Sequence, residues 1–124
     1  MRTAKLTIDG RTYLLCFSAR VMRACVDRYG SMSGVNEALS DTDPGKALDE
    51  SIWLLSSMMD AGTRYARLNG LECPEALTYD QMYDACGIDD LEGLKGKIAE
   101  TIRESNRTNV EVEPPKNGAA TPGS

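Results

Sequence analysis

The sequence predicts a mainly α-helical (α+β) fold, in which an N-terminal β-hairpin packs on a small domain of about four to five helices and a C-terminal tail is disordered. Near the N-terminus, an Asp-Gly pair separates two short runs rich in apolar residues. From about residue 18 to residue 105 apolar residues recur at helical spacing, and from 106 onward Pro, Gly and small residues dominate. A chain of 124 residues is long enough for one core, so we divide it into a hairpin-plus-helical domain, 1–105, and a flexible tail, 106–124.

The hairpin is predicted around the turn Asp9-Gly10. Both central positions of a two-residue type I′ turn need positive φ, which these residue types tolerate. A two-stranded hairpin is barely stable in water, so its apolar face must rest on the helices. The turn pairs Leu6 with Tyr13, Ala4 with Leu15 and Thr7 with Thr12, and it gives the apolar face Ala4, Leu6, Ile8, Tyr13, Leu15 and Phe17.

Two helices are predicted next. Ser18 is a suitable N-cap for the first helix, and Gly30 is a suitable C-terminal glycine. Phe17 and Met22 stand at the positions of a hydrophobic staple around that N-cap. A short second helix is expected from Ser33 to about Leu39.

The longest helix is predicted to begin after Asp43, as N-cap, with Pro44 at its first position, and to run to Leu68. Asn69-Gly70 would end it. Its apolar positions form a single stripe, so we expect it to be the central helix of the core. The stripe consists of Leu48, Ile52, Leu55, Met59, Gly62, Tyr65 and Ala66, widened by Leu54 and Met58.

Two further helices complete the domain. Thr78 and Gln81 have the spacing of a capping box, which predicts a helix of about two turns ending at Gly87. The last helix is expected from Asp89 or Asp90 to about Ser105, weakened in its first half by two glycines.

Composition argues against an enzyme and against a metal or cofactor. The chain has no His, which removes the commonest general base and metal ligand, and its four cysteines include no C-x-x-C pair. Phosphate-binding glycine motifs are also missing. We therefore expect no cofactor, no metal site and free thiols in a reducing cytoplasm, three of them packed as small apolar groups. The apolar run Ile52 to Leu55 has only four residues and is far too short to span a membrane.

The net charge of −5 is unevenly distributed. Residues 1–41 carry six basic and four acidic side chains, whereas residues 42–105 carry six basic and thirteen acidic ones. Seven of those acids fall within 72–92, where no Lys or Arg occurs. Acids in the first turns of helices and on a solvated surface explain this run most simply, and an acidic face for a basic protein partner is the functional alternative.

An acidic protein is a poor candidate for binding nucleic acid, and we expect no nucleic-acid partner. The alternative is a small DNA-binding regulator, in which Arg20, Arg23 and Arg28 of the first predicted helix would contact the DNA phosphates. An ordinary solvated helix face explains these arginines better.

Trp53 lies off the apolar stripe of the long helix. It either packs under a second layer, for which the hairpin is one candidate, or anchors a partner protein, and burial is favoured. Met58 and Met59 have the same two interpretations, core filling or an adaptable contact surface. If the helix binds a partner, the predicted contact residues are Trp53, Met58, Met59 and Arg64.

The chain resembles the tail assembly chaperones of long-tailed bacteriophages and prophages, particularly those of Gram-positive hosts. Three stretches carry this resemblance: 6–13 with 16–20 and 29–31; 47–55 with 59–65 and Asn69-Gly70; and Val110 to Glu113 with Lys116-Asn117.

The resemblance implies a non-enzymatic protein of the bacterial cytoplasm that is absent from the mature virion. Its partners would be the tape measure protein, which it keeps soluble, and tail tube subunits, which it helps to recruit. The alternative is a structural tail or head-to-tail joining protein that stays in the virion. The sequence leaves the oligomeric state open, self-association included.

Overall fold

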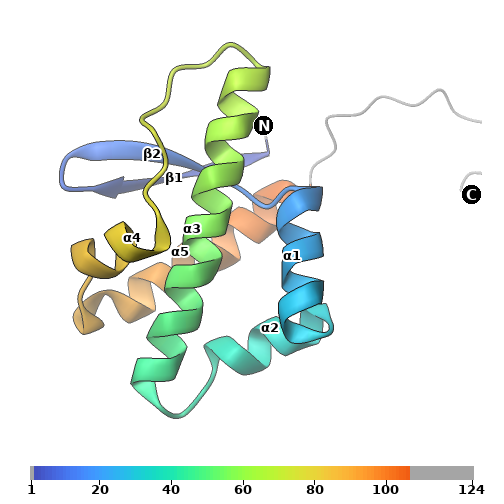
Figure 1. The fold of residues 1–124 in the computed structure, drawn as a ribbon, viewed down its shortest axis with the longest axis vertical. Helices are drawn as coiled ribbons and strands as arrows, with labels where there is room; N and C mark the ends of the chain where they lie inside the picture. The colour runs from blue at the N-terminus through green and yellow to red at the C-terminus, as the bar shows by residue number, and fades with distance from the viewer. Residues whose placement is uncertain (1, 107–124) are drawn as a thin grey trace, which may run out of the picture.

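The computed structural model describes residues 2–106, which form a β-hairpin and five α-helices, with the hairpin packed against the longest helix and the last one (Figure 1). The structure is 66% helical, and the predicted mainly α-helical class with an N-terminal hairpin is confirmed. The strands are β1 (Thr3–Ile8) and β2 (Arg11–Cys16), and the helices are α1 (Ala19–Tyr29), α2 (Met32–Leu39), α3 (Pro44–Leu68), α4 (Tyr79–Ala85), the 3₁₀ turn η1 (Ile88–Asp90) and α5 (Leu91–Ser105).

The hairpin has the predicted turn and register. Asp9 and Gly10 take φ values of 50° and 82°, and β1 pairs antiparallel with β2 so that Leu6 faces Tyr13. On the outer face the hydroxyls of Thr7 and Thr12 lie 2.9 Å apart. The apolar face points into the core, as the alternation requires.

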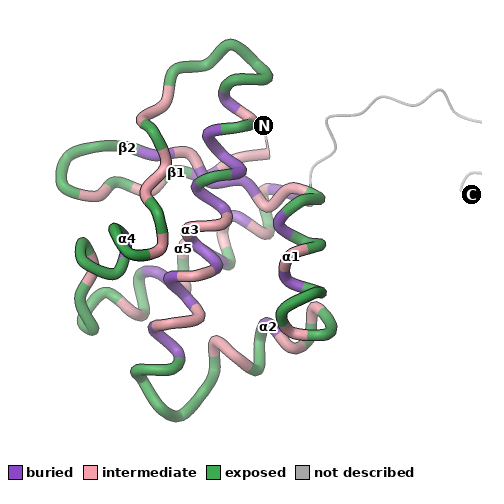
Figure 2. The backbone as a smooth tube through the Cα atoms, in the orientation of Figure 1, coloured by how far each residue is buried: buried purple, intermediate pink, exposed green. Residues whose placement is uncertain are grey.

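Helix α3 runs through the centre of the fold and packs against β2 and against the other four helices (Figure 1). Its N-terminus forms as predicted, because the Asp43 carboxylate accepts a hydrogen bond from the Gly45 amide at 2.9 Å. Gly62 marks its closest approach to the hairpin, since a Cβ built there would stand 1.9 Å from the Leu14 carbonyl oxygen. Burial covers most of the helix's circumference, including Ile52, Leu54, Leu55, Met58 and Met59 (Figure 2).

The remaining helices begin and end close to the predicted residues. Ser18 caps α1 and Gly30 ends it with φ 83°. Helix α2 begins one residue earlier than expected, because Ser31 rather than a later residue caps it. Thr78 and Gln81 form the predicted capping box of α4, and the 3₁₀ turn η1 precedes α5.

The two ends of the described chain are tied together. The Arg2 guanidinium donates to the Ser105 carbonyl at 2.7 Å, and the Ser105 hydroxyl accepts from the Phe17 amide at 3.1 Å. Helix α5 therefore ends beside the base of the hairpin. Apart from Asn106, which follows the last residue of α5, the predicted disordered tail 106–124 lies outside the described residues, and so does the third stretch of the resemblance, Val110 to Glu113 with Lys116-Asn117.

Candidate partner-binding surfaces

Trp53 is half-buried on α3, and its cover comes from α1. The Tyr29 ring meets the indole edge-on, with centroids 5.7 Å apart and planes at 87°. The guanidinium carbon of Arg28 lies 4.5 Å from the indole centroid. The hairpin, the candidate for that second layer, does not cover Trp53, because it packs around Gly62, about 13 Å farther along α3.

A carboxylate holds this aromatic cluster in place. Glu50 accepts hydrogen bonds from Arg28 Nε at 2.9 Å and Nη2 at 3.2 Å, and a third from the Tyr29 hydroxyl at 2.5 Å. The hydrogen bonds from Arg28 lower the pKa of Glu50, whereas burial together with the Glu50 carboxylate raises the pKa of Tyr29. The cluster therefore joins α1 to α3 through a charge-assisted pair and an aromatic contact.

The predicted contact residues on α3 do not form one surface. Met58 and Met59 have no exposed area, so of their two interpretations the structure selects core filling, and they offer no surface to a partner. Arg64 is exposed and pairs with Asp60 at 2.9 Å on the same helix. Trp53 and Arg64 share a side of α3 but are separated by about 16 Å of helix.

Two aromatic residues of α4 lie next to the first candidate surface, which is formed by Trp53 with Arg28, Tyr29 and Glu50. The Tyr83 hydroxyl donates to Asp49 of α3 at 2.8 Å, and the Tyr79 ring lies 5.7 Å from the Tyr83 ring. The hydrogen bond to Asp49 raises the pKa of Tyr83, and burial followed by the Asp49 carboxylate raises that of Tyr79. Tyr83 remains 44% exposed, so this surface ends in an aromatic side chain available to solvent.

A second surface is an apolar groove of about 410 Å³ where α1, the start of α2 and the end of α5 meet. We call it the α1–α5 groove. Its apolar lining consists of Phe17, Ala19, Met22, Met32 and Ile102, and its polar lining includes Arg2 and Asn106. Met22 is 44% exposed, and Val26, one turn farther along α1, is 39% exposed.

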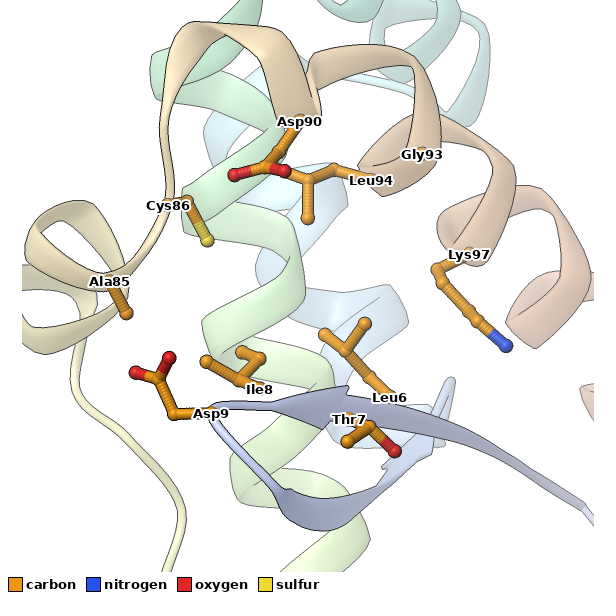
Figure 3. A pocket seen from close by; sticks show the side chains of 10 residues that line it. All are labelled: Leu6, Thr7, Ile8, Asp9, Ala85, Cys86, Asp90, Gly93, Leu94 and Lys97. Atoms are coloured by element: carbon orange, nitrogen blue, oxygen red, sulfur yellow. The ribbon is translucent and has the colours of Figure 1, made fainter.

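A third surface is a hollow of about 500 Å³ between the tip of the hairpin and the α4–α5 connection. Figure 3 shows Leu6 and Ile8 rising from β1 towards Leu94, while Cys86 enters from the side. Asp9, Asp90 and Lys97 also line the hollow, which we call the hairpin hollow.

The charged side chains of α1 are largely engaged. Arg23 pairs with Asp27 at 3.2 Å, and Arg28 is held by Glu50 over the indole. Of the three arginines considered for DNA contact, two therefore have protein partners, which leaves Arg20 without an ion pair among residues 2–106.

All four cysteines are free thiols, as expected. Cys16 and Cys25 are buried, which raises the pKa of both thiols, whereas Cys73 and Cys86 are only partly buried. The partly buried Cys86 packs against the buried core, so three of the four thiols pack as small apolar groups, as expected. Residues 2–106 contain no group of three metal-ligating side chains, and none of their helices is both long and apolar enough to cross a membrane.

The sequence could not identify Arg28, Tyr29 and Glu50 as companions of Trp53. These contacts join residues more than 20 positions apart, and no local pattern announces them. The sequence contains a weak indication of the α1–α5 groove, because two of its lining residues, Phe17 and Met22, occupy the hydrophobic-staple positions around Ser18. Comparisons of the chain with protein-family models, characterised proteins and solved structures found no match.

Proposed function

We propose that this chain is a tail assembly chaperone of long-tailed bacteriophages or prophages. It acts in the bacterial cytoplasm, binds the tape measure protein, keeps it soluble and helps to recruit tail tube subunits, without catalysing a reaction and without remaining in the virion. The sequence resemblance suggests the family. The observation that supports the proposal in the structure is the α1–α5 groove, an open apolar surface on a small folded domain.

The groove suits a helical client. Methionines contribute unbranched, polarizable side chains that adapt to varied apolar surfaces, and Met22 and Met32 stand on opposite elements of this groove. An amphipathic helix buries its apolar stripe in such a surface through contacts repeated every three or four residues. Met22 lines the groove, and Val26, exposed one turn farther along α1 and outside the lining, continues the apolar surface at that spacing. A long helical client has many such stripes to cover.

Co-expression with the tape measure protein tests the proposal. We expect the tape measure protein to be soluble when this chain is present and insoluble when it is absent. The double variant Met22→Glu with Val26→Glu should lose this effect, since two carboxylates would then face the client's apolar stripe. Circular dichroism checks that the variant folds.

Leu68→Glu is the matched control, because Leu68 is 83% exposed and lies at the end of α3 rather than in the groove. It should leave the solubility of the tape measure protein unchanged. A client that stays insoluble with the wild-type chain contradicts the proposal. Mass spectrometry of purified particles addresses the structural alternative, because this chain at stoichiometric amounts in mature tails would make it a virion component.

A further inference from the structure

The hairpin hollow has two facing apolar walls within a mixed lining. Leu6 and Ile8 of β1 form one wall, and Leu94 of α5 faces them (Figure 3). Gly93 also lines the hollow, and a Cβ built on it would meet nothing within 4 Å. The lack of a side chain at this helical position therefore keeps space open beside Leu94.

The chemistry of Cys86 makes it part of this apolar wall. Its thiol is partly buried and lies near the carboxylates of Asp90 and Asp9. Burial, followed by these two negative charges, raises the pKa of the Cys86 thiol, so the group stays neutral and weakly nucleophilic near neutral pH. Cys86 thus adds apolar contact area rather than reactivity.

The rim of the hollow is negatively charged. Asp9 and Asp90 stand at it, and the only cation in its lining, Lys97, is paired with Glu100 at 3.1 Å. Asp84 of α4 and Asp89 of η1 belong to the same acid-rich part of the chain, are exposed and form no ion pair within residues 2–106. Ile88 of η1, an apolar residue of this same part of the chain, is 51% exposed.

We propose that the hairpin hollow binds a basic segment of a partner protein, which inserts one bulky apolar side chain between β1 and α5 while its Lys and Arg residues lie against the acidic rim. Charge complementarity identifies the occupant, because Asp9 and Asp90 border the open space and form no ion pair within residues 2–106. The Asp90 carboxylate accepts a hydrogen bond from the Gly87 amide at 2.7 Å, which holds it in place and leaves its negative charge without a cation. An apolar anchor in a pocket surrounded by a charged rim is a common arrangement at protein interfaces. This site is separate from the α1–α5 groove.

This proposal rests on the proposed function only in assuming that the partner is a protein. Peptide binding to the full chain therefore tests it without the tape measure protein. The probe is a fluorescein-labelled 12-residue peptide with one central Leu flanked by Lys and Arg. One matched peptide replaces Leu with Ala, and another replaces the basic residues with Glu. Fluorescence anisotropy should give a dissociation constant in the micromolar range for the basic Leu peptide and binding at least about 10-fold weaker for both others.

Two glycine variants locate the site. Gly93→Leu fills the hollow and should weaken binding of the Leu peptide by about 10-fold. Gly96→Leu is the matched control, because Gly96 lies in the same helix, has equal room for a side chain and does not line the hollow. It should change the affinity by less than about 2-fold.

Asp9→Asn tests the charge contribution, since Asn also tolerates the positive φ of the hairpin turn. It should weaken the basic Leu peptide and make its affinity less dependent on salt. Equal binding of the Leu and Ala peptides, or equal loss in both glycine variants, would overturn the proposal. So would a dimer of the chain itself that forms without peptide and is abolished by Gly93→Leu. If the Met22→Glu with Val26→Glu variant fails to solubilise the tape measure protein but still binds the peptide, the client binds at the α1–α5 groove and the peptide binds elsewhere.

Discussion

At the scale of single residues, Gly62 controls how closely the central helix approaches the hairpin. A Cβ at this position would lie 1.9 Å from the Leu14 carbonyl oxygen and 2.4 Å from its carbon, both of them backbone atoms of β2. A strand backbone cannot rotate away as a side chain can, so Gly62→Ala must move α3 and β2 apart. We expect a loss of about 2–3 kcal/mol in the free energy of unfolding, measured by urea titration with circular dichroism.

Gly96→Ala is the control for that prediction. Gly96 lies inside α5, and nothing stands within 4 Å of its Cβ position. Alanine should therefore raise the free energy of unfolding by about 0.5–1 kcal/mol through helix propensity. Equal stability of the Gly62→Ala variant and the wild type would mean that α3 and β2 are not in close contact.

Two buried threonines differ in their hydrogen bonding. Thr63 Oγ1 has no hydrogen-bond partner among residues 2–106, whereas the Thr101 hydroxyl donates to the Lys97 carbonyl at 2.7 Å. Thr63→Val replaces an unsatisfied hydroxyl with a methyl group and should raise the free energy of unfolding by about 1 kcal/mol. Thr101→Val should lower it by a similar amount. Urea titrations that order the two variants the other way would disprove this difference.

At the scale of elements, the pair Arg28–Glu50 joins α1 to α3 and makes stability depend on pH. The folded-state pKa of Glu50 is lowered from its ordinary 4.5, chiefly by the hydrogen bonds from Arg28. A lowered folded-state pKa means that the stabilisation is present above 4.5 and is lost as the pH falls through the folded-state value.

Glu50→Gln should therefore cost about 1 kcal/mol at neutral pH and progressively less in acid, since the pair is partly exposed. Urea titrations of both proteins at neutral pH and well below pH 4 measure this change. An Arg28→Met variant and the double variant complete a cycle that isolates the pairwise energy. A stability difference that does not shrink in acid would show that the carboxylate charge is not responsible.

Local signals explain why the sequence predicted most element boundaries. Asp43 before Pro44, and Thr78 before Gln81, define helix starts through contacts within three residues, and both appear as expected. The side chain that covers Trp53 depends instead on how α1 packs against α3, which no local pattern encodes. The apolar pattern of α3 put Met58 beside the core stripe but did not show which helix would cover it. Its two interpretations therefore stayed open until the structure showed it fully buried.

At the scale of the whole molecule, charge is segregated. The seven carboxylates of residues 72–92 gather on α4, η1, the start of α5 and the loop before them, and only Glu75 and Glu92 of these form ion pairs within the described chain, with Arg67 at 3.6 Å and Lys95 at 3.8 Å. Like charges repel in the folded state, and sodium chloride screens them. Raising it from about 10 mM to about 150 mM should increase the free energy of unfolding by roughly 1 kcal/mol. A decrease in thermal-unfolding measurements would mean that attractive pairs dominate.

The contact between Arg2 and Ser105 brings the two ends of the described fold close enough for a circular permutation. Because the two ends of the described fold lie within one arginine side chain of each other, a short Gly-Ser linker can join residue 106 to residue 2. New ends can then be opened between Leu71 and Glu72, both exposed in the loop after α3. Such a circular permutant keeps every helix and both strands whole, so it should fold to the same structure with the hairpin in the middle of its sequence.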